Sequence, residues 1–310
     1  MKPVSSVGSN SDLIRQLLEV SDWVPLGSYE GRVTSQNKSY LVEMDGEKYK
    51  LRRCSSQQEA QRIFNIVSLL EPLSIVPPCM AFESEIVVSK YLEGRALTLG
   101  EQESLYYQLG QKIGYLHYNS IIAATSNFSY EQAFVERAEI IAERLGSSAL
   151  LDELLAAFHK WRPPDVRVGV VHTDLCLPNL LLFQDKILIV DEESFGFEVI
   201  GCDLVKALYV WLRPSAVYDA FFAGYDSRVS SQYLWAHLPF YRLYFFVKLL
   251  AHNTRILPEW NTIKYYYLLL KGLKIPSFRL SEYWTRFFVR VGLDKLIFSV
   301  RTRNINCLWE

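Results

Sequence analysis

The chain has 310 residues, of which 50% are hydrophobic and 22% are charged, a composition typical of globular proteins and unlike that of disordered chains. Its formal net charge of -1 argues against a nucleic-acid-binding protein that relies on a basic face, so no nucleic acid is expected among its partners. The 5 cysteines are scattered without a C-x-x-C pair, which favours reduced thiols over a disulfide framework or a zinc site.

The two ends of the sequence contain no obvious membrane signal. The N-terminal stretch MKPVSSVGSNSD lacks the apolar run of a secretory signal. The most apolar segment of the C-terminal part, LPFYRLYFFVKLLAH, is interrupted by Arg242 and Lys248 and is shorter than the roughly 20 apolar residues of a membrane span. We therefore expect a cytoplasmic protein with no membrane span.

The first part of the chain is predicted to be rich in strands. Residues 11–20 have the apolar spacing of a short helix, and the period then changes to two. Residues 40–44 and 48–52 flank Asp45-Gly46, which is a strong signal for a β-hairpin. A helix over residues 55–70 and a strand over residues 86–91 follow, and Gly94 breaks the pattern.

Beyond Gly94 the spacing of apolar residues is mostly helical. Helices are predicted over residues 101–119, 131–145, 150–161 and 203–212, and aromatic helices continue to about Phe298. The layout predicts an α+β protein with a small β-rich N-terminal lobe over residues 1–92 and a larger, mainly helical lobe over residues 93–310. A cleft between two such lobes is a natural ligand site.

One hairpin interrupts the helices and carries polar groups at both ends. Its strands are Leu180 to Phe183 and Ile187 to Val190, with a turn at residues 184–186. His172, Asp174 and Asn179 precede the hairpin and three carboxylates at residues 191–193 follow it. A hairpin brings its two ends together, so we expect these groups to be neighbours in space.

The spacing of these groups points to phosphoryl transfer. His-x-Asp, four residues and then Asn is the order of a kinase catalytic loop, with a metal-binding Asp further along the chain. Asp174 is then the predicted catalytic base, and Asn179 and Asp191 are the predicted Mg²⁺ ligands. Alternatively, the loop residues are ordinary turn formers, since Asp and Asn favour turns. The carboxylates at 191–193 argue against that alternative, because clustered carboxylates repel unless a cation joins them.

Two basic residues of the N-terminal lobe are candidates for phosphate binding. Strand alternation places Lys50 and Arg52 on one face, opposite Tyr49 and Leu51. A cation on this face would reach the α- and β-phosphates of a nucleotide. Arg52 is the first candidate and Lys50 the second, and periodicity does not separate them. The alternative is a solvated strand face.

Several further residues have two possible roles. Glu59 is predicted either to pair with the cation of the preceding strand or to complete a capping box that starts at Ser56. Segment 31–38 is a weak candidate for a phosphate loop, because it is poor in glycine. The aromatic residues around Tyr265–Tyr267 and between residues 235 and 260 form either core or the wall of a pocket for a cationic acceptor. His117 is predicted to pack within the helices.

Taken together, these motifs resemble those of the aminoglycoside phosphotransferase and choline kinase superfamily, which has the protein-kinase-like fold. The segments that carry the resemblance are Thr34–Glu43, Tyr49–Arg52, Gln58–Ala60, Val88–Gly94, Leu109–His117, His172–Asn179, Ile189–Glu193 and Gly201–Leu204.

The resemblance implies a two-lobed fold with ATP and Mg²⁺ as cofactors. It places adenine against the backbone of the connection between the lobes, at Lys90 and Tyr91. It makes His172 and Asp203 structural support for the catalytic loop, with an N-cap as the alternative role for Asp203. It also suggests that Glu193 faces the acceptor.

The sequence departs from the family pattern at two places. Glu192 stands where an aromatic residue is usual, and Thr173 to Cys176 replace the commoner Gly-Asp-Leu-His. These departures concern the substrate more than the activity. The sequence therefore predicts an ATP- and Mg²⁺-dependent kinase of a small hydroxylated molecule, such as an aminoglycoside, a choline-like amino alcohol or a sugar-like acceptor. The alternatives are a catalytically silent nucleotide-binding regulatory module and a kinase acting on protein side chains.

Overall fold

The computed structural model describes residues 11–20, 22–26, 38–122, 128–145, 148–212 and 215–256. These described residues form two compact units, the first from the ranges up to residue 130 and from 165 to 235, and the second from the ranges 131–164 and 236 onward. The predicted lobe boundary at residues 92–93 falls inside the first unit and stays a prediction. Nearly all of segment 31–38 and the aromatic residues Tyr265–Tyr267 lie outside the described residues.

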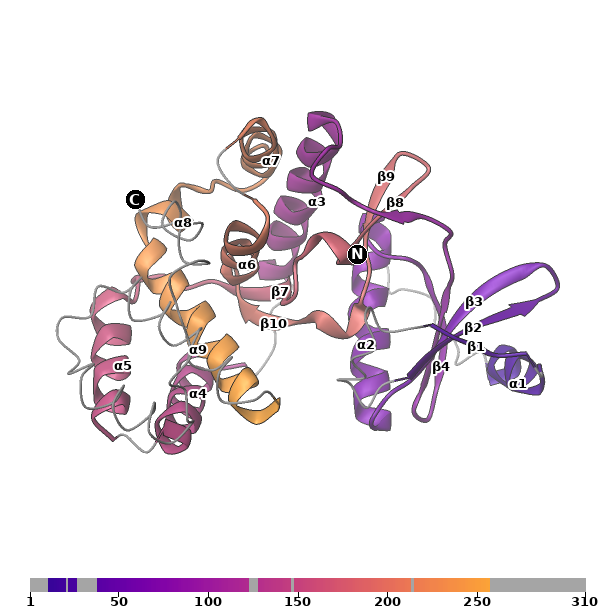
Figure 1. The fold of residues 1–310 in the computed structure, drawn as a ribbon, viewed down its shortest axis with the longest axis horizontal. Coiled ribbons are helices and arrows are strands. Elements are labelled where there is room, and N and C mark those ends of the chain that lie inside the picture. The colour runs from indigo at the N-terminus through magenta and orange to yellow at the C-terminus, as the bar shows by residue number, and fades with distance from the viewer. Residues whose placement is uncertain are drawn as a thin grey trace, which may run out of the picture. The chain divides into compact units, whose positions relative to one another are not determined.

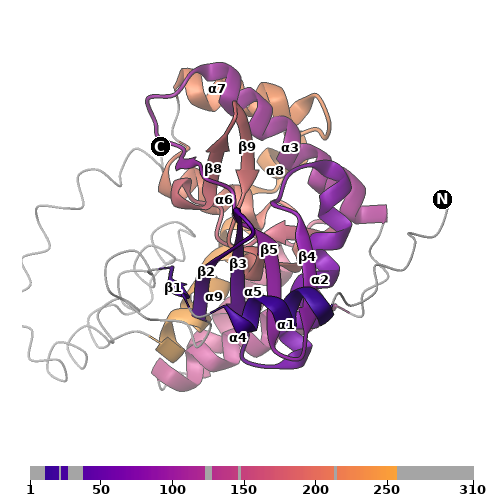
Figure 2. The same ribbon diagram turned by 90° about the vertical axis from the view of Figure 1, so that its right-hand side faces the viewer.

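The N-terminal part of the first unit (Figure 1) contains a five-stranded antiparallel sheet in the order β1-β2-β3-β5-β4, which can be followed in Figure 2. Its strands are β1 (Val24–Pro25), β2 (Lys38–Met44), β3 (Glu47–Arg53), β4 (Cys79–Glu83) and β5 (Ile86–Lys90). The predicted hairpin is confirmed as β2 and β3. Asp45 and Gly46 connect them with φ values of 54° and 76°, the left-handed pair that a type I′ turn requires.

Two helices cover opposite faces of this sheet. They are α1 (Ser11–Glu19) and α2 (Gln57–Leu70), and both helices were predicted. They lie on either side of the strands in Figure 1, and Figure 2 looks onto the face that α1 covers. Leu17 of α1 belongs to one buried cluster with Leu51 and Val88. Because side chains alternate along a strand, Lys50 and Arg52 then face the opposite side, where α2 lies.

Two smaller sheets are formed by strands that come after β5 in the chain. The predicted second hairpin is confirmed as β8 (Leu180–Phe183) and β9 (Lys186–Ile189), and β6 (Arg95–Ala96) pairs with β8. Its turn consists of Gln184 and Asp185, both with positive φ. The other sheet, β7 (Val168–His172) with β10 (Phe195–Val199), was not predicted. His172 therefore ends a strand instead of lying in an irregular stretch.

Two helices of the first unit, α3 (Glu103–Ile122) and α7 (Ala216–Asp226), pack with their backbones in close approach. The unit also contains α6 (Cys202–Val210) and α8 (Gln232–Ala236). A Cβ placed on Gly110 of α3 would lie 2.0 Å from the carbonyl oxygen of Phe221, and one on Gly224 of α7 would lie 2.0 Å from that of Tyr107. Backbone therefore contacts backbone across this pair of helices.

Lys112 of α3 connects three segments of the first unit. Its Nζ donates to the carbonyl oxygen of Ser74, which follows α2, and to that of Ile187 in β9, each at 2.8 Å. The backbone amide of Ile189 also donates to the carbonyl of Ile75 at 2.7 Å. The segment before β4 is thereby held against the second hairpin.

The second unit contains α4 (Tyr130–Leu145), α5 (Ser148–Trp161) and α9 (Leu238–Ile256). Phe134 stacks on Phe158 with ring centroids 4.2 Å apart, and Phe240 and Tyr244 of α9 complete the cluster. These two α9 aromatics are buried, so they form core, which was one of the two predicted roles of the aromatic region. Within the described ranges no helix is both long and apolar enough to cross a membrane.

Candidate active site

The second hairpin brings its two polar ends together, as predicted. The backbone amide of Val190 donates to the carbonyl oxygen of Asn179 at 2.9 Å. His172 Nε2 lies 3.1 Å from the carbonyl oxygen of Val190 and 3.3 Å from that of Asp191. Both partners are acceptors, so Nε2 carries the proton. Burial lowers the pKa of His172, so a neutral imidazole holds the backbone at Asp191 in place.

Asp174 follows β7 and is held by two side chains. Asn179 Nδ2 donates to the carbonyl oxygen of Asp174 at 2.9 Å and to its Oδ2 at 3.1 Å, while Lys206 Nζ of α6 lies 2.9 Å from Oδ1. Burial favours the protonated acid, but the Lys206 ammonium outweighs it and the pKa of Asp174 is lowered. Asp174 is therefore ionised at neutral pH and keeps about 44% of its side chain exposed.

Asp191 occupies a backbone conformation that suits few residues. Its φ of 69° and ψ of 60° are left-handed, and it caps a single 3₁₀ turn over Glu192–Ser194. Asp and Asn tolerate this region better than other residues with a Cβ. Asp191 Oδ2 accepts a hydrogen bond from Ser194 Oγ at 2.7 Å, and Oδ1 lies 3.4 Å from Arg52 Nη2.

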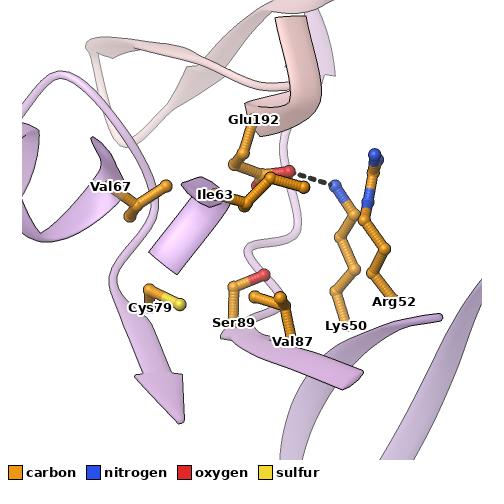
Figure 3. A pocket seen from close by; sticks show the side chains of 8 residues that line it. All are labelled: Lys50, Arg52, Ile63, Val67, Cys79, Val87, Ser89 and Glu192. Atoms are coloured by element: carbon orange, nitrogen blue, oxygen red, sulfur yellow. Dashed lines mark hydrogen bonds and ion pairs between the residues drawn. The ribbon is translucent and has the colours of Figure 1, made fainter. Parts of the chain in front are cut away.

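The two cations of β3 meet the carboxylates after the hairpin. Lys50 Nζ lies 2.7 Å from Glu192 Oε2, the pair drawn in Figure 3, and Arg52 pairs with Asp191 and Glu193. Arg52 is only 7% exposed and Glu192 4%, so these side chains do not form a solvated face. Burial alone would raise the pKa of Glu192, but Lys50 and then Arg52 outweigh it and lower that pKa to about 2.

The charges and ligand types at this place fit a divalent cation. Three carboxylates at residues 191–193 meet two cations of β3, which leaves one negative charge. Asn179 donates through its nitrogen, which leaves its side-chain oxygen to act as a ligand beside Asp191. Mg²⁺ prefers such oxygens and usually takes only one or two protein ligands beside phosphates and water. A complete cage of three or more His, Cys, Asp or Glu side chains is absent from the described residues.

A small pocket lies behind the β3 cations (Figure 3). Its cavity volume is about 10 Å³, room for about one water molecule and far less than the roughly 300–1,000 Å³ of a typical ligand site. Its lining residues are Lys50, Arg52, Ile63, Val67, Cys79, Val87, Ser89 and Glu192. Because the pocket is small and its back wall is apolar, it is a side pocket of the charged site and not a complete nucleotide site.

Helix α2 carries the predicted residue Glu59 and, one turn later, Arg62, which was not predicted. The Glu59 backbone amide donates to Ser56 Oγ at 3.2 Å, as the predicted capping box requires. The Glu59 carboxylate accepts from the backbone amide and the hydroxyl of Ser55, however, and not from the Ser56 amide. Arg62 lies one turn later and donates to the carbonyl oxygens of Glu193 and Phe195. The i, i+3 spacing of these two residues was the available signal for Arg62.

The connection between the predicted lobes has its amides already bonded. Lys90 N donates to the carbonyl of Pro78 at 3.0 Å and Tyr91 N donates to that of Lys48 at 2.9 Å. Lys90 Nζ lies 2.9 Å from Glu47 at the surface. A contact between adenine and Lys90 or Tyr91 would therefore have to use their carbonyl oxygens.

Asp203 belongs to a buried hydrogen-bond network that joins α6 to α3. Its Oδ2 lies 2.9 Å from His117 Nε2, and His117 Nδ1 lies 2.9 Å from the Tyr225 hydroxyl. Gly201, not Asp203, is the N-cap of α6. Asp203 is close enough to His172 to act on its pKa, and its bond to His117 ties α6 to α3. This anchor fixes the helix that presents Lys206, one turn further along.

A family model described as the phosphotransferase enzyme family matches residues 33–243, which is more than half of the chain. No curated protein sequence matches the chain.

Solved structures share the fold at low sequence identity. Choline kinase LicA from Streptococcus pneumoniae is 16% identical with a TM-score of 0.63, covering 85% of this chain and 97% of its own. Amicoumacin kinase hAmiN, in complex with AMP-PNP, Ca²⁺ and Ami, is 17% identical with a TM-score of 0.57, covering 86% and 93%. The microcompartment-associated aminopropanol kinase is 19% identical with a TM-score of 0.55, covering 86% and 97%.

Proposed function

The chain belongs to the phosphotransferase enzyme family, and we propose that it transfers the γ-phosphate of ATP to a hydroxyl of a small molecule with the help of Mg²⁺. The observation that carries this proposal is the gathering of Asp174, Asn179 and Asp191 at the ends of one hairpin, next to the two cations of β3. Each group that phosphoryl transfer needs is then present: a base, oxygen ligands and phosphate-binding cations.

Asp174 is the proposed base. It is ionised and half exposed, and Asn179 fixes its orientation. As the acceptor oxygen bonds to the γ-phosphorus, the bond from that phosphorus to the β,γ-bridging oxygen breaks. The acceptor proton passes to Asp174 and the electron pair of the broken bond stays on ADP. A base within hydrogen-bond reach of the hydroxyl meets the geometric requirement of this step.

Arg52 and Lys50 are the proposed contacts to the nucleotide phosphates, and Asn179 and Asp191 would hold Mg²⁺. When bound, the ion would neutralise phosphate charge. Since Arg52 and Lys50 pair with carboxylates here, phosphates would compete with those carboxylates for the same donors. The proposed role of Glu193 at the acceptor competes with its pairing to Arg52 in the same way.

The acceptor class is proposed from the fold relatives. Structures with this fold include a choline kinase, an aminopropanol kinase and an amicoumacin kinase. A first acceptor panel therefore contains choline, aminopropanol and amicoumacin, together with the aminoglycosides and simple sugars expected from the sequence. ATP is located in the cytoplasm, where we propose that this protein acts.

The test is ADP release by the wild-type protein and by Asp174→Asn across this panel. Asp174→Asn is expected to lose at least about 100-fold in kcat, the scale of general base catalysis, with little change in thermal stability. Asp185→Asn is the matched control, because Asp185 is exposed at the hairpin turn with a positive φ that Asn also adopts.

The alternatives give different results. Tight ATP binding in thermal shift without ADP release for any acceptor would favour the silent regulatory module. Equal ADP release by the wild-type protein and Asp174→Asn would refute Asp174 as the base.

A further inference from the structure

The ammonium group of Lys206 lies beside Asp174 and has hydrogen-bond donors that the described residues do not use. Its Nζ lies 2.9 Å from Asp174 Oδ1, and its side chain is only 20% exposed. An ammonium group has three N–H donors, and within the described residues Asp174 is the one polar partner of Lys206. Two donors therefore remain for a ligand, on a cation that is largely withdrawn from water.

The position of these donors follows from the proposed base. An acceptor hydroxyl must lie within about 3 Å of the Asp174 carboxylate to give up its proton. The γ-phosphorus must lie in line beyond that hydroxyl oxygen. Because Lys206 binds the same carboxylate, its remaining donors lie next to the place where the phosphoryl group is transferred.

Other nearby groups do not supply this charge. Lys50 and Arg52 are already assigned to the α- and β-phosphates of the nucleotide, in competition with the carboxylates at 191–193. Cys176, two residues after the base, is a neutral thiol, because burial and the charge of Asp174 raise its pKa to about 11. Lys206 also comes from a fixed element, since α6 is anchored by the buried Asp203–His117 bond.

We propose that Lys206 is a catalytic residue whose ammonium donates hydrogen bonds to the non-bridging oxygens of the transferred phosphoryl group. This inference rests on the proposed kinase function and adds a residue that the sequence did not single out. Negative charge spreads over these oxygens during transfer, and a donor fixed beforehand at that place stabilises the transition state. The rival explanation is that Lys206 only orients or neutralises Asp174.

The first experiment measures nucleotide binding and needs no turnover. Affinities for AMP-PNP and ADP with Mg²⁺ are measured by calorimetry for the wild-type protein and Lys206→Met. The wild-type protein is expected to bind AMP-PNP more tightly than ADP, because Lys206 makes a charge-assisted contact to the γ-phosphate. In Lys206→Met this ratio of affinities should fall about tenfold. Lys206→Arg should restore part of it. Lys186→Met is the matched control, since Lys186 is exposed at the start of β9.

The second experiment measures steady-state kinetics. Lys206→Met is expected to lower kcat by about 100-fold, the scale of a lost transition-state donor, while KM for the acceptor changes little. In the Asp174→Asn background, Lys206→Met should lower the residual rate further, because the phosphoryl contact does not pass through the base. If Lys206 acts only through Asp174, the double variant will match Asp174→Asn alone.

The results separate the two proposals. An unchanged AMP-PNP preference in Lys206→Met, or no further loss in the double variant, overturns the role of Lys206 and leaves the kinase function standing. A wild-type protein that neither binds ATP nor releases ADP overturns both.

Discussion

Glu192 stands where the resembled kinases usually carry an aromatic residue, and the structure buries it nevertheless, at 4% exposure. Its charge is matched by Lys50, which projects from β3 at 2.7 Å. A buried ion pair costs desolvation on both sides and gains most of it back only while both partners are present. The departure at 192 is therefore compensated by a cation 142 residues earlier in the chain.

This compensation gives a stability prediction. Lys50→Met leaves the Glu192 charge buried without its nearest cation, so unfolding free energy should fall by about 3 kcal/mol. Adding Glu192→Leu should recover most of that loss, because an apolar pair removes both desolvation costs. Urea unfolding of the two single variants and the double variant measures the coupling.

The control for this cycle is the exposed pair of Lys48 and Glu93. Lys48→Met should change stability by less than about 1 kcal/mol, as exposed ion pairs do. A double variant at 50 and 192 that is as unstable as Lys50→Met would contradict a compensating pair.

Part of the candidate site could be predicted residue by residue. The order of His172, Asp174 and Asn179 and the hairpin after them predicted their proximity to Asp191, because neighbours along a hairpin are fixed by local geometry. Lys206 and Arg62 were missed, since they reach the site only through the packing of α6 and α2. Spacing along the chain does not contain that information.

Among the elements, helices with a clear period and strands that flank a turn signal were predicted, whereas the isolated strands β4, β7 and β10 were not. The turns at Asp45-Gly46 and Gln184-Asp185 use left-handed residues that mark hairpins, and the helices showed a 3.6-residue period. β7 was missed because its residues are almost all buried, so no polar alternation marks the strand. β4 was missed because it follows directly after Pro77-Pro78, which reads as a turn.

The close approach of α3 and α7 leaves no room for a methyl group on their glycines. Gly110→Ala and Gly224→Ala would each place a methyl group 2.0 Å from a backbone oxygen of the other helix. Backbone cannot rotate away as a side chain does, so each variant should lose about 1–3 kcal/mol or more of unfolding free energy. Thermal and urea unfolding provide the measurement.

Gly100→Ala is the control for these glycine variants. A Cβ on Gly100 would meet nothing within 4 Å. The stability of Gly100→Ala should therefore be unchanged or slightly higher than that of the wild-type protein, because alanine lowers the conformational entropy of the unfolded chain. Equal effects at positions 100 and 110 would show that the close packing of the helices is not the cause.

For the molecule as a whole, Lys112 links stability to pH. Burial, and next the charge of Lys186, lower the pKa of Lys112 to about 8 from its ordinary 10.5. Between these two values the unfolded chain binds more protons than the folded chain at this group, so its contribution to stability increases as pH rises. Below pH 8 the cost of keeping the charge buried is fully present.

Removing the Lys112 charge should change how the unfolding free energy depends on pH. The unfolding free energy of the wild-type protein minus that of Lys112→Met should increase from pH 8 to pH 10.5. Denaturant unfolding at several pH values measures it. Parallel pH curves for the two proteins would show that the pKa of Lys112 is not lowered in the folded state.

The distance along the chain between β3 and its carboxylate partners has a consequence for synthesis. Lys50 and Glu192 are separated by 142 residues, and a ribosome adds about 5–20 residues per second. Strand β3 therefore waits roughly 7 to 28 s before the anions that will neutralise it have been translated. During that interval its two cations face water, and nascent-chain crosslinking to polyanions would detect them until residue 193 emerges from the exit tunnel.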